Sequence, residues 1–288
     1  MCLRCERLIS ATPAAASPWQ PRRAFLLAAA GAAGAALSGQ VLAQVNVGNA
    51  SVARNLVPAE KIEAAGVQQY GQLLAQARTK GALAGDNNPQ LQRLRTIAQR
   101  LIPFATPWNT RARDWKWEVN LLGSKQINAF CMPGGKIAFF TGILEELKLS
   151  DDEVAMVMGH EMAHALREHA RARMAKTAGT GAVLSMGAQL MGWGQVGDLA
   201  ARAGTQLIAL KFSRSDETEA DLVGLELAAR AGYDPKASVS LWNKMAAASK
   251  RQGGLSFLST HPSGTDRISK LEANIPKVES LYRSAKRG

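Results

Sequence analysis

The sequence His160-Glu161-Met162-Ala163-His164 determines how the rest of this chain is interpreted. On a helix, residues at i and i+4 lie on the same face, so the two histidines can present imidazole nitrogens to a single ion. Zn²⁺ is commonly held by such nitrogens. The glutamate lies about 100° round the helix from the first histidine, where its carboxylate can serve as a base beside the metal. We therefore predict two metal ligands and a general base on one helix.

The motif falls within residues 150–174, which we predict to be a single buried helix. Ser150 and Glu153 have the spacing of a capping box, and the acidic first turn suits the helix dipole. The alternative is a chance His-Glu-x-x-His on a solvated helix. Two facts argue against that: only four histidines occur in the chain, and the residues around the motif are apolar, namely Val154, Met156, Val157, Met158, Met162, Ala163 and Ala165.

Residues 1–43 have the pattern of an export signal. Arg22 and Arg23 precede an uncharged Ala/Gly/Leu segment at 24–42, and small residues at 41–43 provide a cleavage site. The glycines within that segment fit a twin-arginine signal better than a spanning helix, although a retained membrane anchor is the alternative. We therefore expect the protein to be periplasmic.

The chain is basic, with a formal net charge of +12. Removal of the signal takes away four arginines and one glutamate, which leaves +9. In an exported protein this charge favours contact with anionic membrane surfaces or acidic polymers. The sequence contains no nucleic-acid-binding motif, so we expect no nucleic-acid partner; salt-sensitive retention on DNA would contradict this.

After the signal we expect a polar linker at 44–57, one domain that carries the metal motif at 58–276 and a basic tail at 277–288. The hydrophobic content of 47% is ample for a sizeable core. Apolar periodicity and capping residues predict several helices ahead of the metal helix, at 58–80, 89–101 and 141–147. The expected fold class is α+β, mainly α, with one small β-sheet.

Three short strands are predicted before the metal helix, at 115–122, 127–132 and 136–140, with a tight turn at 133–135. We expect them to form a small antiparallel sheet beside the zinc helix. An exposed strand edge in that position can bind an extended peptide as an added strand. An ordinary packed hairpin is the alternative.

Residues 177–197 carry no charge and six glycines. This segment is too glycine-rich and polar for a membrane span. We expect paired short helices or a mobile flap over the cleft, with peripheral membrane contact as the alternative. Residues 199–211 are predicted to be helical again.

A third metal ligand is expected from a helix that begins near residue 212 and runs to about residue 231. Glu217 and Asp221 share one face of this helix at i and i+4. One carboxylate can complete a zinc site of two histidines and a glutamate or aspartate, and the other can accept the free N–H of a ligand histidine. An acidic helix N-terminus favoured by the dipole is the alternative for both residues.

These motifs, in this order, resemble a known family of zinc metallopeptidases. It includes HtpX and the CAAX prenyl endopeptidases, and the similarity extends to the soluble periplasmic BepA- and LoiP-like members. The resemblance covers about residues 89–276. It rests on Asn128-Ala129-Phe130 with Pro133-Gly134-Gly135, His160-Glu161-Met162-Ala163-His164, Ser213-Arg214 with Glu217-Thr218-Glu219-Ala220-Asp221, Ala231-Gly232-Tyr233-Asp234-Pro235, and Thr260-His261-Pro262 with Arg267.

The resemblance implies roles for individual residues. One Zn²⁺ per chain would be held by His160, His164 and Glu217, and Glu161 would be the base. Asp221 would orient a ligand histidine, expected to be His160. The edge-strand residues that would bind substrate are Asn128, Ala129 and Phe130.

Two further residues near the carboxyl end take roles by the same resemblance. His261 is expected near the metal as a substrate-side or inhibitory fourth ligand. Arg267 is expected to bind the oxyanion or the substrate carbonyl, for which a guanidinium is suited. The alternative is a proline-containing loop with a surface histidine and arginine.

The sequence thus predicts an exported gluzincin-type endopeptidase that hydrolyses peptide bonds and acts in periplasmic protein quality control. Its expected substrates are unfolded or misassembled envelope proteins. The rival prediction is a chaperone-like binding factor for envelope proteins, with a structural or self-blocked zinc site. A closed four-ligand site that includes His261 would favour this rival, because it leaves no position for water.

Overall fold

The computed structural model describes residues 45–178, 207, 210–252, 255–262, 264 and 266–287. The expected export signal at 1–43 lies outside these residues, as do most of the expected flap and of the helix predicted at 199–211. Among the described residues, no helix combines the length and apolar character needed to cross a membrane.

The β-sheet lies beside the metal helix, as expected, but its strand pairing differs from the prediction. Strands β1 (Glu118–Leu122), β2 (Ala129–Met132) and β3 (Lys136–Phe140) lie in the order β1-β3-β2. β2 and β3 form an antiparallel hairpin, whereas β1 runs parallel to β3. The predicted antiparallel sheet is therefore wrong in one of its two pairings. The reason is that β3 inserts between β1 and β2, so these two strands are consecutive in sequence but not neighbours in the sheet.

The hairpin turn explains why the sequence places glycines between β2 and β3. Gly134 and Gly135 have φ angles of 86° and 75°. L residues with a side chain rarely adopt such angles. A Cβ on Gly135 would also lie 2.8 Å from the Trp117 ring. The turn leaves β2 at the edge of the sheet, where β3 is its only strand neighbour among the described residues.

The helices that precede the metal helix agree with the predicted ranges. They are α2 (Ala59–Thr79), α3 (Pro89–Leu101) and α4 (Thr141–Leu147). The Asn88 side chain caps α3 by accepting hydrogen bonds from the backbone N–H groups of Gln90 and Leu91. The expected mainly helical fold class is confirmed.

The metal helix is shorter than predicted, because the chain breaks inside residues 150–174. The structure has α5 (Asp151–Leu166), opened by the expected Ser150–Glu153 capping box, and then α6 (His169–Ala178). Between them Glu168 has a φ of 57°, a strained angle for a residue with a side chain. Neither glycine nor proline marks this break, so the single helix predicted from periodicity is wrong here.

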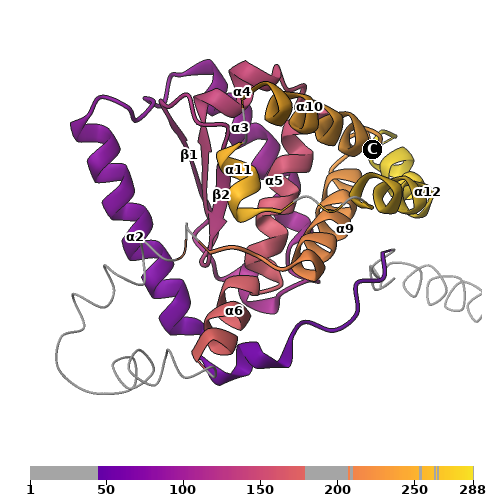
Figure 1. Ribbon diagram of the computed structural model, residues 1–288, viewed down its shortest axis with the longest axis horizontal. Coiled ribbons are helices and arrows are strands. Elements are labelled where there is room, and N and C mark those ends of the chain that lie inside the picture. The colour runs from indigo at the N-terminus through magenta and orange to yellow at the C-terminus, as the bar shows by residue number, and fades with distance from the viewer. Residues whose placement is uncertain are drawn as a thin grey trace, which may run out of the picture. The chain divides into compact units, whose positions relative to one another are not determined.

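Helix α9 (Arg214–Arg230) crosses α5 at two glycines. A Cβ on Gly224 would lie 2.6 Å from the backbone nitrogen of His160, and one on Gly159 would lie 2.8 Å from the Gly224 carbonyl oxygen. The two backbones therefore touch where the metal motif begins. Figure 1 shows α5 between the sheet and α9.

Three further helices complete the described chain, and two of them carry residues that the sequence singled out. They are α10 (Ala237–Gln252), α11 (Ser256–Thr260) and α12 (Arg267–Ala285). His261 follows α11 directly, and Arg267 begins α12, which packs against α9. α12 continues through Pro276, so the expected domain boundary at 276 falls inside a helix.

The segment at 45–57, expected as a linker, is attached to the domain at several points. Val45 is buried, and its backbone N–H donates to the buried carboxylate of Glu226 on α9. The 3-10 helix η1 (Val52–Leu56) packs against α6. The main hydrophobic core lies around α5. Most of its largest fully buried side chains come from α3, the sheet and α5, and include Leu91, Leu94, Leu121, Phe139, Met158 and Met162.

Candidate metal centre

Helices α5 and α9 bring together the three side chains that the sequence proposed as metal ligands. His160 Nε2 lies 3.1 Å from His164 Nε2 and 3.5 Å from Glu217 Oε2. His164 Nε2 lies 3.4 Å from Glu217 Oε1. Ligand atoms about 2.0–2.1 Å from a tetrahedral ion are themselves about 3.3 Å apart. The three groups therefore have the spacing that one ion requires.

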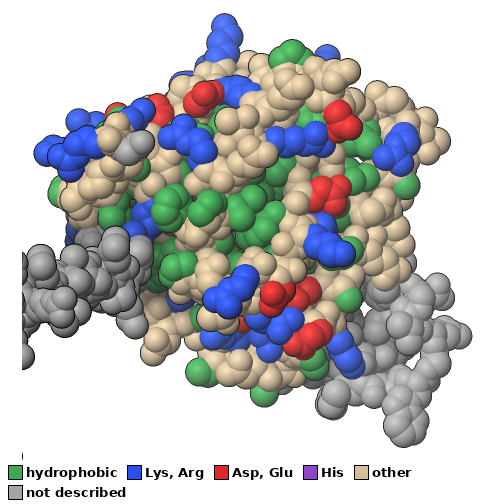
Figure 2. All heavy atoms as spheres, turned by 180° about the vertical axis from the view of Figure 1, so that it is seen from behind, with side chains coloured by type: hydrophobic (Ala, Val, Ile, Leu, Met, Phe, Trp, Pro, Cys, Tyr) green, Lys and Arg blue, Asp and Glu red, His purple; other side chains and the backbone are tan. Residues whose placement is uncertain are grey.

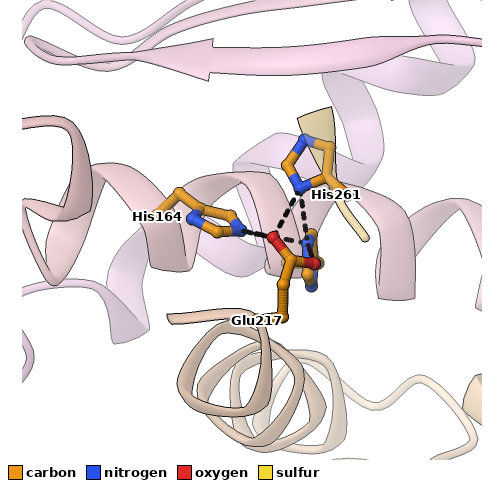
Figure 3. Close-up of side chains that lie close together, drawn as sticks. His164, Glu217 and His261 are labelled. Carbon is orange, nitrogen blue, oxygen red and sulfur yellow. Dashed lines mark hydrogen bonds and ion pairs between the residues drawn. The ribbon is translucent and has the colours of Figure 1, made fainter. Parts of the chain in front are cut away.

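His261 joins this cluster from the other side. Its Nδ1 atom lies 3.3 Å from His160 Nε2 and 3.0 Å from Glu217 Oε1. The four candidate ligand atoms all lie within 4.8 Å of one another, and all four residues are buried. Figure 3 shows His164, Glu217 and His261 pointing toward one another from α5, α9 and the end of α11. His261 is thus no surface residue, because only 3% of it is exposed.

The chemistry of this donor set fits a zinc ion. Imidazole nitrogens and a carboxylate oxygen are ligands that Zn²⁺ prefers, and four of them match its tetrahedral coordination. The protonation states of His164 and Glu217 fit as well. Burial lowers the pKa of His164, and hydrogen bonds from His164 and His261 outweigh burial to lower the pKa of Glu217. A neutral imidazole and an ionised carboxylate are the forms that bind a metal.

Glu161, the expected base, lies beside the cluster and not within it. Its side chain is buried, and Oε1 lies 3.5 Å from His261 Nε2 without a hydrogen-bond donor among the residues that the structure describes. Burial raises the pKa of Glu161 above its ordinary value. A raised pKa makes a carboxyl group a better acceptor of a proton than an ordinary exposed carboxylate.

A cavity of about 40 Å³ opens between α5 and the edge strand β2, and Glu161 and His164 line it. The expected substrate-binding residues Asn128, Ala129 and Phe130 line the same cavity. Asn128 accepts a hydrogen bond from Phe140 at the end of β3 through its backbone carbonyl. The edge of β2 is therefore next to the candidate base, although its contact with substrate stays a prediction.

Asp221 and Arg267 lie behind the ligands. Asp221 Oδ1 is 3.0 Å from His160 Nδ1, as expected of a residue that orients this histidine. Arg267 donates from Nε and Nη2 to Asp221, and its Nη2 lies 3.0 Å from Glu217 Oε2. Its guanidinium stacks 3.4 Å above the Trp242 ring. Arg267 is absent from the lining of the cavity beside Glu161, so its expected contact with an oxyanion stays a prediction.

Three residues that the sequence did not single out for the centre lie close to it. His169 Nδ1 is 3.0 Å from His164 Nδ1. Its Nε2 is 3.4 Å from Glu219 Oε2, to which Arg167 also donates. In a continuous helix His169 would lie off the ligand face, about 140° round from His164. The break at Glu168 brings it back, and no residue type at the break signals this in the sequence.

All four histidines of the chain lie in or beside this centre, and each is at most 4% exposed. On the face of the molecule in Figure 2, no histidine is visible. That face instead shows Lys and Arg side chains around an area of hydrophobic side chains. All four histidines therefore lie in the interior of the molecule.

Several known proteins have sequences similar to this chain. The chain is 38% identical over 168 residues to the mitochondrial metalloendopeptidase OMA1 of Schizosaccharomyces pombe, covering 58% of this chain and 49% of that protein. It is 29% identical over 195 residues to the metalloprotease LoiP of Escherichia coli, covering 66% and 72%. It is 30% identical over 190 residues to the β-barrel assembly-enhancing protease of Yersinia pestis, covering 62% and 37%.

These matches confirm the resemblance inferred from the motifs. The chain spans about half, or less, of the length of the OMA1 and β-barrel assembly-enhancing relatives. The region shared with all three includes the metal-binding motif of α5, and the sequence profile described as Peptidase family M48 matches residues 88–275. That match covers well over half of the 288 residues. The chain therefore belongs to peptidase family M48.

Proposed function

We propose that this protein is a zinc-dependent endopeptidase that hydrolyses peptide bonds in protein substrates. The observation that carries the proposal is the placement of Glu161. Its buried carboxylate lies beside the cluster of His160, His164 and Glu217 and faces a cavity bounded by an edge strand. When bound by this cluster, Zn²⁺ supplies a Lewis acid that lowers the pKa of water to about 7 and polarises the scissile carbonyl.

The side chains of this protein supply the remaining steps. Glu161 accepts the proton of the attacking water and passes it to the leaving amine, a role that its raised pKa favours. Asp221 accepts the Nδ1 proton of His160 and so keeps Nε2 free for the metal. β2 offers its free edge to an extended segment of the substrate.

His261 favours a second candidate function. Its Nδ1 atom lies where a fourth ligand would lie, 3.0 Å from Glu217 Oε1. A zinc site closed by four protein ligands is typical of a structural role. The protein would then hold unfolded proteins along β2 without cleaving them, or would cleave them only after His261 moves away.

We also propose that the protein is exported and acts on unfolded or misassembled envelope proteins. The export-signal pattern at 1–43 supports this, as do the relatives LoiP and the β-barrel assembly-enhancing protease. The OMA1 relatives are named as mitochondrial, so family membership alone does not decide the compartment. Fractionation of cells that produce the full chain should place it in the periplasm or at a membrane facing it. Recovery in the cytosolic fraction alone would contradict the proposal.

The decisive variant for the chemistry is Glu161→Gln. It removes the base and leaves the ligands in place, so we expect unchanged zinc content and cleavage of casein slowed by at least about 100-fold. Glu153→Gln, at the opposite end of the same helix, is the matched control and should keep both properties. Cleavage by Glu161→Gln at the rate of the parent would contradict the proposed mechanism.

Replacement of His261 separates the two candidate functions. If His261 blocks the active site, His261→Ala should cleave casein faster than the parent, because a coordination position becomes free. Absence of cleavage by both proteins, with zinc bound to each, would favour the binding factor. In that case retention of an unfolded protein by the parent should be lost when a proline in β2, such as Cys131→Pro, disturbs the strand edge.

A further inference from the structure

The two histidines of the metal motif have different hydrogen-bond partners at Nδ1, the ring nitrogen that does not face the ligand cluster. His160 uses Nδ1 to reach the Asp221 carboxylate directly, at 3.0 Å. His164 has no carboxylate at that position. Its Nδ1 atom lies 3.0 Å from Nδ1 of another histidine, His169, which is itself 3% exposed.

The hydrogen atoms in this contact can be assigned from the geometry. The Nε2 atom of His164 points to the ligand cluster, so a proton on this imidazole must lie on Nδ1. His164 Nδ1–H then donates to His169 Nδ1. The second proton position of His169 is therefore Nε2, which lies 3.4 Å from Glu219 Oε2. The chain of hydrogen bonds has one consistent direction, from His164 through His169 to Glu219.

Glu219 is in turn held by an arginine. Arg167 Nε donates to Glu219 Oε2 at 2.9 Å, and its Nη2 atom donates to the carbonyl oxygen of Gly48 at 2.9 Å. Only 7% of Arg167 is exposed. The arrangement is parallel to that of His160, whose partner Asp221 is held by the buried Arg267. In both cases a carboxylate from α9 is anchored by an arginine, but Asp221 contacts the ligand histidine directly, whereas Glu219 contacts the intervening His169.

The backbone around Glu168 makes this arrangement possible. The left-handed conformation of Glu168 ends α5 and starts α6 at His169, which turns the imidazole back toward His164. This conformation costs free energy in a residue with a side chain. Ion pairs of Glu168 with Arg54 at 3.1 Å and with Arg171 at 2.6 Å oppose that cost. Strain of this kind is frequently kept where it serves a site.

We propose that His169 and Glu219 are positioning residues for the metal ligand His164: they fix its tautomer and the direction of its Nε2 lone pair through one intervening imidazole. The proposal rests on the proposed function only in taking the ion to be zinc. It assigns a use to the third histidine of the sequence His-Glu-x-x-His-x-x-x-x-His. Groups that orient a metal ligand in this way commonly contribute about 10–100-fold to metal affinity.

The test is the zinc dissociation constant of the full chain, measured by competition with a chromophoric chelator at neutral pH. His169→Phe keeps an aromatic ring but removes both nitrogens, and should weaken zinc binding about 10–100-fold. His169→Asn keeps an acceptor near the Nδ1 position and should recover a large part of this loss. Glu219→Gln should also weaken binding, because His169 loses the charge that orients it.

Two measurements distinguish positioning from a general loss of stability. Glu153→Gln removes a buried carboxylate from the far end of α5 and should leave the zinc dissociation constant unchanged. The ¹⁵N chemical shifts of His164 should report an Nδ1–H tautomer in the parent and a mixture of tautomers in metal-free His169→Phe. If His169→Phe does not fold, the variants His169→Asn and Glu219→Gln decide the question.

The proposal is overturned if His169→Phe and Glu219→Gln both bind zinc within about threefold of the parent, because the loss expected for such groups is about 10–100-fold. It is also overturned if Glu153→Gln weakens binding as much as they do. A parent protein that binds no zinc would instead contradict the proposed function, so the two failures can be told apart.

Discussion

At the scale of single residues, the candidate metal centre depends on charges buried behind the proposed ligands. Arg267 and Asp221 are 6% and 8% exposed and share two hydrogen bonds. Such a pair is costly to bury, and removal of one partner leaves the other charge unpaired in the interior. The fixed position of Asp221, and through it of His160, therefore depends on Arg267.

We predict that Arg267→Met lowers the free energy of unfolding of the metal-free protein by about 3–5 kcal/mol, as expected when a buried ion pair loses one partner. Urea denaturation measures this. The matched control is Lys270→Met, one turn further along α12, whose ion pair with Asp266 is largely exposed. That control should change stability by about 0–1 kcal/mol. Equal changes in the free energy of unfolding for the two substitutions would show that the buried Arg267–Asp221 pair contributes no more to stability than the exposed pair.

At the scale of elements, the distance between α5 and α9 decides whether two imidazoles and a carboxylate can meet. Gly159 and Gly224 remove the side chains that would otherwise separate the two backbones. His160 follows the first glycine directly, and the Glu217 side chain lies two turns before the second. The helix crossing therefore places the ligands, and the capping boxes at Ser150 and Ser213 define where each helix starts.

Gly224→Ala is predicted to force the two helices apart. The added Cβ would lie 2.6 Å from the His160 backbone nitrogen, and overpacking of this kind commonly costs about 1–3 kcal/mol. Zinc affinity should fall as well, because the separation of His160 and Glu217 increases. Urea denaturation and chelator competition measure the two effects.

The control for this substitution is Gly71→Ala on α2, where a Cβ would meet nothing within 4 Å. Replacement of an exposed helical glycine by alanine should stabilise the protein by about 0.5–1 kcal/mol. A Gly224→Ala protein as stable as the parent, with the same zinc dissociation constant, would contradict the role given to the helix crossing.

At the scale of the whole molecule, the centre joins segments that are distant in sequence. α5, α9 and the end of α11 meet at four buried candidate ligands, and the segment at 45–57 is attached to α9 and α6 through Glu226 and Arg171. An ion that binds the folded protein, where these segments meet, but not the unfolded chain stabilises the folded state of the whole domain.

We predict that removal of zinc with a chelator lowers the thermal midpoint of unfolding and that added zinc restores it. At a free zinc concentration 100-fold above the dissociation constant, the stabilisation should be about 2.7 kcal/mol. Differential scanning calorimetry measures the shift. Glu161→Gln should show the same shift as the parent, because Glu161 is not a ligand, whereas Glu217→Ala should show little or none. The same midpoint in the parent with and without zinc would contradict a metal centre at this place.

The sequence by itself determined the features that depend on neighbours along the chain. The capping box at Ser150, the start of α3 at Pro89 and the shared helical face of His160 and His164 follow from hydrogen bonds and side-chain directions within a few residues. The mainly helical class and the family followed from the same local patterns and their order.

Only the tertiary structure decided how these local pieces meet. It placed β3 between β1 and β2 and turned His169 back toward His164 at a break without glycine or proline. The physical reason is that each of these outcomes depends on packing and charge pairs between segments far apart in sequence. The ion pairs that hold Glu168, for example, include one with Arg54, more than a hundred residues earlier.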